Sequence, residues 1–362
     1  MMFKLTILDR YILKKYLVTF VFVVLIIITV ICVIDYTEKN EDFLTKNVPL
    51  REIFISYYLN FIPYVINILS PILVFIATVF VTARLASRTE IIAILSSGTS
   101  FLRILRPYLL GSAIIAIVTY YMYGWVIPRA SRIRHGFENV YVRGQYFFDK
   151  RNVHIKVAPT SYVYMESYNN SIHCGYQFTI ETIDIGRVID KLSASRIVWK
   201  EDIKKWRIEY WTKHSFEGKK EIETRGNELD TTLNLSPKDF ETQHMLYEQM
   251  TIDELSAQVD LLTQRGAEGV EPYLIEKYTR QTYPFSIIIL TIIGVIVSSR
   301  KSREGVGLQI ALGFGLAFMY IIFMIIGQSI GKGGAITPAL SAWIPNVIFS
   351  GIGLIMYFRV PK

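Results

Sequence analysis

The sequence predicts a polytopic α-helical membrane protein, with six transmembrane helices and one β-rich domain inserted on the extracytoplasmic side. Three observations predict this fold class. The 362 residues are 51% hydrophobic and carry a net charge of +8, a combination that departs from soluble globular composition. The apolar residues are concentrated in six long windows. Between the third and the fourth window, the pattern changes to short segments rich in β-branched and aromatic residues.

Each of the six windows lacks charged residues and is long enough to cross a bilayer as a helix. A spanning helix needs about 20 residues, because a rise of about 1.5 Å per residue must cover about 30 Å of hydrocarbon. The sequence therefore predicts six spans, which are Tyr16–Ile34, Ile53–Ala83, Pro107–Pro128, Gln281–Ser299, Gly305–Gly331 and Gly333–Phe358.

The basic residues orient the bundle, because Lys and Arg beside short loops are retained on the cytoplasmic side. The loop between the first two windows, residues 35–52, carries five acids and three bases. The opposite side carries only the acids Asp9, Glu90 and Glu304 against a large excess of bases: Lys4, Arg10, Lys14, Lys15, Arg84, Arg88, Arg103, Arg106, Arg300, Lys301, Arg303, Arg359 and Lys362. Both termini are expected in the cytoplasm, and the soluble segment outside it. Such localised charge is not a nucleic-acid signature.

Four parts follow along the chain. Residues 1–128 hold helices 1–3, residues 129–248 the β-domain, residues 249–280 an amphipathic helix and linker, and residues 281–362 helices 4–6. Segments such as "YVYMESY", "FTIETIDI", "SASRIVWK" and "KWRIEYW" favour an antiparallel β-sandwich or jelly roll. "TIDELSAQVDLLTQRG" predicts a helix that starts at a Thr251/Glu254 capping box and ends at Gly266.

We find no sequence motif for nucleotide binding, metal binding or ion coupling. The string "GQSIGKGG" has the wrong spacing for a phosphate-binding loop and lacks Ser or Thr after Lys332. Cys32 and Cys174 are expected to be unpaired, and no metal-ligand spacing connects the five histidines: His135, His154, His173, His214 and His244. The interiors of the windows hold almost no ionisable groups for ion coupling. We therefore expect no catalytic residues, no bound metal and no enzyme activity in this chain.

The connector between the second and third windows, "RLASRTEIIAILSSGTSFLRIL", is basic and amphipathic. It predicts a cytoplasmic helix over about residues 86–98, with Ile91, Ile94 and Leu95 on one side and Gly98 ending it. Arg88 and Glu90 remain available on other faces. Two interpretations stay open: a helix on the membrane surface whose arginines meet anionic lipid, or a docking helix whose Glu90 pairs with a cation of a cytoplasmic partner.

Five segments spread over the whole chain carry a family resemblance: "LDRYILKKYL" (8–17), "ASRTEIIAILSSG" (86–98), "WVIP" (125–128), "SASRIVWKEDIKKWRI" (193–208) and "TPALSAWIPNVIF" (337–349). Their order, and the layout of three helices, one domain and three helices, resemble the LptF/LptG permeases of the lipopolysaccharide exporter. The opening "LDRYI" and the later "IDYTEK" look more like the LptG branch.

The resemblance implies half of a pair of homologous permeases on a cytoplasmic ATPase dimer, which would bind the ATP and magnesium. This chain would bind no cofactor of its own. The connector helix would dock on the ATPase, with Glu90, Arg88, Arg84 and Gly98 as the coupling residues. Thr89 stands where the family has a serine. Nucleotide binding would move the docking helices and narrow a cavity that holds the lipid.

The resemblance also implies a site for the lipopolysaccharide headgroup in a Gram-negative inner membrane. Lys39 matches a basic position of the family, and Arg129, Arg132 and Arg134 follow the third window. Cys32 stands where some members carry a second lysine, so headgroup contacts are expected to differ in detail.

The periplasmic β-jellyroll would receive the lipid and pass it to a periplasmic jellyroll bridge protein, in some cases membrane-anchored. Trp199, Trp206 and Tyr210 would line its groove or form its core. Two other functions stay open: an ion-coupled lipid or solute transporter, and a scaffold or sensor with a periplasmic binding domain.

Overall fold

The computed structural model describes residues 6–142, 151–184, 187–217, 220–235, 237, 246–264, 269–299 and 306–359. It divides into two compact units. The transmembrane unit comprises residues 1–142, 248–253 and 274–362, and the sheet unit comprises residues 143–247 and 254–273. The chain thus leaves the first unit, builds the second and returns.

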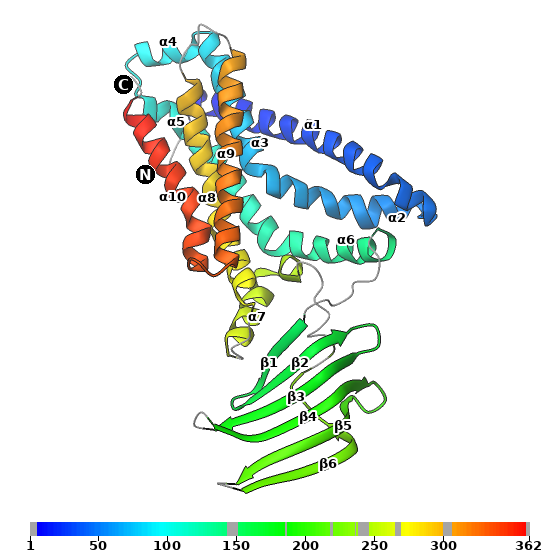
Figure 1. The fold of residues 1–362 in the computed structure, drawn as a ribbon. Coiled ribbons are helices and arrows are strands. Elements are labelled where there is room, and N and C mark those ends of the chain that lie inside the picture. The colour runs from blue at the N-terminus through cyan, green and yellow to red at the C-terminus, as the bar shows by residue number, and fades with distance from the viewer. Residues whose placement is uncertain are drawn as a thin grey trace. The chain divides into compact units, whose positions relative to one another are not determined.

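The described residues of the transmembrane unit form six helical segments that are long and apolar enough to cross a membrane, which confirms the predicted number of spans (Figure 1). They are α1 (Ile7–Thr45); α2 (Leu50–Glu52), η1 (Ile53–Tyr58) and α3 (Leu59–Ser87) in succession; α5 (Phe101–Tyr121), η2 (Met122–Val126) and α6 (Ile127–Tyr141) in succession; α8 (Glu271–Ser298); α9 (Val306–Lys332); and α10 (Pro338–Phe358). The short helix α4 (Glu90–Ser96) joins α3 to α5.

The first and third segments extend well beyond their apolar windows. Helix continues through the three arginines after the third window to Tyr141, so the domain boundary predicted at residue 129 lies inside α6. Pro128 stands in the first turn of α6, where a missing N–H costs little. Further along, Arg134 and Glu138 face each other one turn apart. The polar composition that marked this stretch as soluble therefore belongs to a helix of the transmembrane unit.

A proline in the middle of α3 is compensated by a tyrosine of α8. Pro71 has no N–H for the carbonyl of Asn67, which would otherwise be its helical acceptor. The Tyr283 hydroxyl donates to this carbonyl at 2.6 Å and contacts the Ile68 carbonyl at 3.0 Å. An unpaired carbonyl is costly where no water is available, so this bond ties α3 to α8.

Two glycines let large side chains sit between helices. A Cβ on Gly111 of α5 would lie 2.6 Å from the ring of Tyr16 on α1, and a Cβ on Gly313 of α9 would lie 2.6 Å from the ring of Phe75 on α3. Small residues at helix contacts are the usual device for close packing in membranes. Gly111 thus serves the contact of α5 with α1, and Gly313 the contact of α9 with α3.

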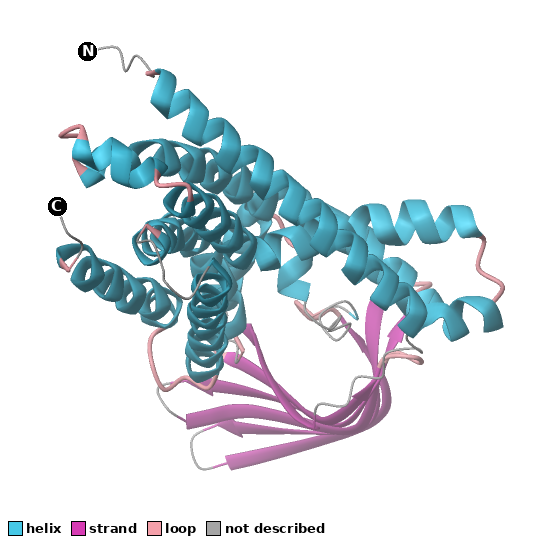
Figure 2. Ribbon diagram, turned by 90° about the horizontal axis from the view of Figure 1, so that it is seen from above, coloured by secondary structure: helices cyan, strands magenta, loops and turns pink. Residues whose placement is uncertain are grey.

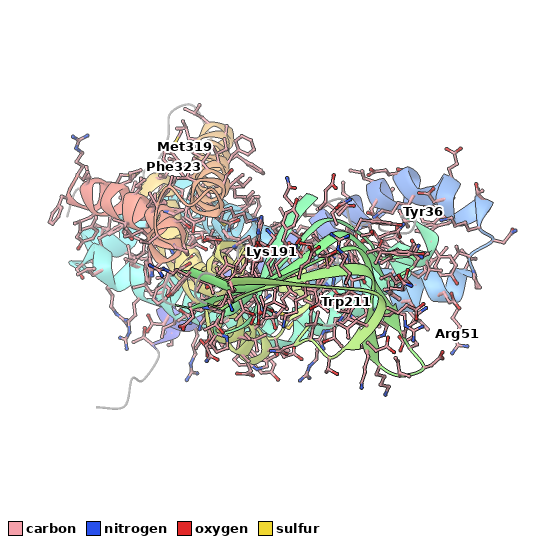
Figure 3. The ribbon with its side chains drawn as sticks, turned by 60° about the horizontal axis from the view of Figure 1, so that its bottom comes forward. Tyr36, Arg51, Lys191, Trp211, Met319 and Phe323 are labelled. Carbon is pink, nitrogen blue, oxygen red and sulfur yellow. The ribbon has the colours of Figure 1, made fainter. Side chains whose placement is uncertain are left out.

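Helices α1 and α9 bury only 11% and 22% of their apolar windows, against 67% for the segment that contains α3 and 61% for α8. Figure 3 labels Met319 and Phe323, two apolar side chains of α9, and Met319 is 47% exposed. Apolar surface of this extent must face lipid or another membrane protein.

In the sheet unit, the described residues form six antiparallel strands that pair in chain order: β1 (Arg151–Ala158), β2 (Ser161–Asn169), β3 (Cys174–Asp184), β4 (Arg187–Lys200), β5 (Lys205–Glu217) and β6 (Lys220–Thr231). The inserted β-domain is therefore confirmed. A jelly roll has two facing sheets, whereas the described strands form a single, strongly curved one, because neighbours in sequence are neighbours in space (Figure 2).

The aromatic residues of the sheet have different surroundings. Trp206 is fully buried, and its indole N–H donates to the Leu235 carbonyl at 2.7 Å, so it belongs to the core. Trp199 packs edge-on against it with ring centroids 5.2 Å apart. Tyr210 is 65% exposed. The interpretation as core is thus right for Trp206, while Tyr210 stays free for contacts.

After the strands, α7 (Ile252–Gln264) begins directly behind Thr251, as the capping pattern predicts. Leu255 and Val259 are buried along one face of this helix. Gly266, the predicted end of the helix, lies outside the described residues.

Candidate functional site

The connector helix is shorter than predicted because the backbone breaks before it. Helix α3 continues to Ser87, so Ala86 belongs to that helix. Thr89 has a left-handed backbone with φ of 61°, and α4 starts only at Glu90. At the other end Gly98, with φ of 79°, donates its N–H to the Leu95 carbonyl and ends the helix as predicted.

One face of α4 is built into the bundle. Ile91 is 1% exposed within a core cluster that includes Leu85 and Phe101, and Ile94 and Leu95 pack against the same cluster. This is the predicted apolar side. The remaining surface is open, since Arg84 and Arg88 before the helix and Ile92 on it are exposed. The connector thus offers an exposed surface that carries two arginines.

Glu90 is held by two residues of α1. The Tyr11 hydroxyl donates to its carboxylate at 3.0 Å, and the Lys15 ammonium lies 4.0 Å from the other carboxylate oxygen. Lys15 also contacts the Tyr11 hydroxyl and lies 4.0 Å from the centre of its ring. The Glu90 side chain stays 29% exposed. It is therefore anchored within the chain and still accessible to a partner.

A second anchor, which the sequence analysis missed, fixes the start of α1 to the start of α5. The Asp9 carboxylate is fully buried and pairs with Arg103 at 2.9 Å. Thr6 and Asp9 cap each other, and the Thr6 hydroxyl accepts a hydrogen bond from Arg103 at 2.8 Å. The sequence shows the capping pattern Thr6-x-x-Asp9, which indicates the start of a helix. It gives no indication of Arg103, the partner of Asp9, which lies 94 residues further along the chain.

Lys39 lies in a compact cluster at the far end of α1. Its ammonium pairs with Asp35 at 2.7 Å, contacts the Tyr57 hydroxyl and lies 5.6 Å from the ring centre of Phe61. Asp35 is itself 8% exposed and accepts hydrogen bonds from Tyr57 at 3.0 Å and Tyr58 at 3.2 Å. The charge of Lys39 is thus neutralised inside the protein.

The three arginines of α6 do not form one cluster. Arg129 is exposed. Arg132 is exposed as well, but donates to the Gln249 carbonyl at 2.7 Å. Arg134 is 5% exposed, with its guanidinium 4.2 Å from the ring centre of Tyr64 and 3.7 Å from Glu138. Only the first two are placed to meet an anion from outside.

Buried charges fasten the segment that returns from the sheet unit. Arg280 is 1% exposed, pairs with Glu276 at 2.8 Å and donates to the Met250 carbonyl at 2.5 Å. Nearby, burial and the neighbouring Glu276 raise the pKa of Glu248 to about 7. The only sequence signal for this cluster was Arg280, directly before the fourth window.

The described residues contain no group of three or more His, Cys, Asp or Glu side chains that could hold a metal ion. Cys32 and Cys174 are both free thiols, as expected from the sequence. His244 lies outside the described part of the chain.

Comparison with known protein families identifies a relationship. The family model described as "Lipopolysaccharide export system permease LptF/LptG" matches residues 10–359, which is nearly the full chain. No curated protein matches this sequence.

Proposed function

Because the chain belongs to the LptF/LptG family of lipopolysaccharide export permeases, we propose that it is the transmembrane subunit of an ATP-driven machine. This machine would extract lipopolysaccharide from the inner membrane and pass it to a periplasmic bridge. The chain is a multi-pass inner-membrane permease subunit and not itself the enzyme. In this proposal, a separate cytoplasmic ATPase dimer binds ATP and magnesium.

The attachment of α4 to α1 carries this proposal. The ATPase docks on the exposed surface formed by the end of α3 and the start of α4, where Arg84, Arg88 and Glu90 are accessible. Both ends of the connector are bonded to the first turns of α1, through Glu90 with Tyr11 and through Arg103 with Asp9. A displacement of α4 therefore pulls on α1, and α1 forms one wall of the lipid path.

A second, homologous permease covers the exposed apolar surface of α1 and α9. These two helices bury the smallest shares of their apolar windows. Both helices contact α3, so α3 holds the two surfaces that the second permease would cover. Helix pairs in membranes associate by packing apolar faces that the single subunit leaves open.

Arg129 and Arg132 meet the phosphates of the lipid, because they are exposed. Lys39 and Arg134 take this role only by exchanging an internal partner, Asp35 or Glu138, for a phosphate. We therefore rank Arg129 first and Arg132 second, since the Nε of Arg132 already donates to the Gln249 carbonyl. In the sheet unit, the two edges of the described sheet, β1 and β6, are the places where a strand of a bridge protein can add.

Co-purification and transport test the role of Glu90. The complex of this chain, the second permease and the ATPase is isolated from membranes and reconstituted with lipopolysaccharide. Glu90→Ala is expected to weaken ATPase binding by about tenfold or more, since it removes a charge-assisted contact. Glu38→Ala, an exposed acid at the other end of α1, serves as the control.

Tyr11→Phe separates the internal role of Glu90 from the external one. This variant loses the hydrogen bond within the chain and keeps the carboxylate for the partner. Full ATPase binding and full transport by Glu90→Ala would refute the proposal. Loss of ATPase binding in Tyr11→Phe equal to that in Glu90→Ala would show that Glu90 serves only the chain itself. Transport that persists without ATP and collapses with an ion gradient would favour the ion-coupled alternative, and a complex without lipid the scaffold or sensor.

A further inference from the structure

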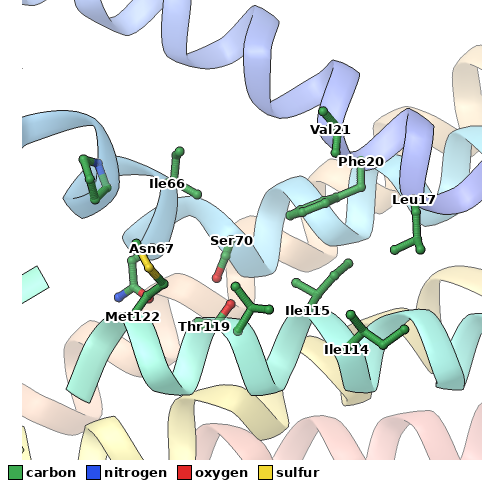
Figure 4. A pocket seen from close by; sticks show the side chains of 12 residues that line it. Leu17, Phe20, Val21, Ile66, Asn67, Ser70, Ile114, Ile115, Thr119 and Met122 are labelled. Carbon is green, nitrogen blue, oxygen red and sulfur yellow. The ribbon is translucent and has the colours of Figure 1, made fainter. Parts of the chain in front are cut away.

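A small polar cavity lies between the last three helices, α8, α9 and α10, all of which are candidate spans. Its volume of about 10 Å³ is close to the roughly 10–15 Å³ that one buried water molecule needs. Polar side chains of all three helices line it: Thr279, Thr282 and Tyr283 of α8, Tyr320 and Gln328 of α9, and Ser341 of α10. The larger space between α1, α3 and α5 has a different lining, because Leu17, Phe20 and Ile115 there are apolar (Figure 4). The small cavity therefore suits one small polar molecule.

Close helix packing buries the polar groups around this cavity. Five of the six polar residues are at most 4% exposed, and Gln328 is partly exposed. A Cβ on Gly331 of α9 would lie 2.5 Å from the hydroxyl oxygen of Ser341, and a Cβ on Gly327 would lie 2.9 Å from the Ser341 carbonyl oxygen. Glycines four residues apart commonly bring helices together in membranes. The hydrogen bonds of these polar groups must therefore be made inside the protein.

Most of the hydroxyl protons around the cavity are already engaged. Four hydroxyl groups donate to carbonyl oxygens: Tyr283 to Asn67 at 2.6 Å, Tyr320 to the side chain of Asn346 at 2.9 Å, Ser341 to Pro338 at 3.1 Å and Thr282 to Thr279 at 3.2 Å. A hydroxyl group has one proton and two lone pairs, so each of these oxygens can still accept a hydrogen bond. The lining is thus rich in acceptors.

Thr279 and Gln328 each retain one unused hydrogen-bonding group. The Gln328 amide N–H donates to the Thr279 hydroxyl oxygen at 3.4 Å, which is a long bond between α9 and α8. Among the described residues, the Thr279 hydroxyl proton has no acceptor and the Gln328 side-chain carbonyl has no donor. Thr279 is 4% exposed, so leaving its proton unpaired is costly. The site needs a molecule that accepts from Thr279 and donates to Gln328.

We propose that one water molecule occupies this cavity and links α8, α9 and α10. It accepts from the Thr279 hydroxyl and donates to the Gln328 carbonyl and to the Ser341 hydroxyl oxygen, which gives the three hydrogen bonds that a buried water typically makes. A metal cation is disfavoured, because the described lining holds no carboxylate to balance its charge. The site lies within one subunit and does not depend on the proposed transport.

Hydroxyl-radical footprinting of the full-length protein in lipid nanodiscs tests the site. An X-ray pulse splits bound water into hydroxyl radicals, which oxidise a methionine beside that water. Met324 lines the cavity, whereas Met319 of the same helix is 47% exposed and faces lipid in a nanodisc that holds this chain alone. We expect Met324 to be oxidised faster than Met319, although Met319 is the more exposed residue. Equal or slower oxidation of Met324 would overturn the proposal.

Four variants and a change of salt complete the experiment. Ala342→Val fills the cavity and should lower the oxidation of Met324 to the rate of Met319. Its matched control, Ala311→Val at an exposed position of α9, should leave the oxidation of Met324 unchanged. Thr279→Val removes the proton that the water accepts and should lower the oxidation of Met324, whereas Thr279→Ser keeps the hydroxyl and should preserve it. Replacing sodium and potassium by choline should change nothing, because the occupant is not a cation. Oxidation of Met324 that survives Ala342→Val or Thr279→Val, or that depends on sodium or potassium, would overturn the proposal.

Discussion

Tyr283→Phe tests whether the tyrosine of α8 repairs the helix break at Pro71. The variant removes only the hydroxyl that donates to the Asn67 carbonyl at 2.6 Å and lies 3.0 Å from the Ile68 carbonyl. Tyr283 is 4% exposed, so water does not replace the lost donor. Leaving a buried acceptor unpaired costs about 1–3 kcal/mol, and we expect a loss of this size in the free energy of unfolding.

The assay is unfolding of the purified protein in detergent, followed by circular dichroism, with Tyr121→Phe as the control. Tyr121 is 61% exposed on α5, and its variant should be neutral. Pro71→Ala sharpens the test, because it restores an N–H for the Asn67 carbonyl. In that background Tyr283→Phe should cost clearly less, which a double-mutant cycle measures. An unchanged stability of Tyr283→Phe, or the same cost in both backgrounds, would refute the reasoning.

Three further predictions concern packing, charge and pH. Gly111→Ala places a methyl group 2.6 Å from the ring of Tyr16 on α1 and should lower the free energy of unfolding by about 1–3 kcal/mol, measured by thermal unfolding. The control Gly315→Ala, whose new methyl group has no atom within 4 Å, should leave the free energy of unfolding unchanged. An equal loss in both variants would contradict the packing argument. Arg103→Met leaves the buried carboxylate of Asp9 without its cation and should lower the unfolding free energy by about 2–3 kcal/mol, whereas wild-type stability would mean that the pair is not needed. The pKa of Glu248 is raised by burial from 4.5 to about 7, so its stabilising contribution is complete below pH 4.5 and is lost as the pH rises through 7. Glu248→Gln cannot ionise, and unfolding measured from pH 5 to pH 8 should show a flatter pH dependence; an unchanged slope would contradict the shift.

The number of spans and the apolar side of α4 followed from the sequence because they depend on local composition. A window of about 20 apolar residues is a sufficient signal for a spanning helix. Likewise, the spacing of Ile91, Ile94 and Leu95 determines which side of a helix is buried. The start of α7 behind Thr251 depends on a local pattern too.

The helix ends and the partners of the charged residues did not follow, because they depend on contacts between distant parts of the chain. Arg134 looked like a surface arginine, yet it is buried against the ring of Tyr64, 70 residues earlier in the sequence. Glu90 was identified as important, but its partner Tyr11 lies 79 residues away. Hydropathy marks where a helix can cross a membrane, and it carries no information on which charges will meet.

The pairing of the strands in the curved sheet could not be predicted from local composition either. Alternating segments predict strands, but a sandwich, a jelly roll and a single sheet share this alternation. The order in which strands pair is set by the short connections, such as those before Ser161 and Lys205. The sequence therefore predicted β-structure at the right place without its topology.

Helix α1 is fastened at its two ends and loosely held between them. One end is bonded through Asp9 and Tyr11, and the other through Asp35 and Lys39. Between Tyr16 and Asp35, the only residue of α1 that is buried is Ile28. The middle of the helix can thus move away from its neighbours without breaking an ion pair, while both of its ends stay in place. Besides the long 3.5 Å contact of the Tyr58 hydroxyl with the Cys32 carbonyl, a lateral opening for lipid in this stretch would break apolar contacts, which the hydrocarbon chains of the lipid would replace.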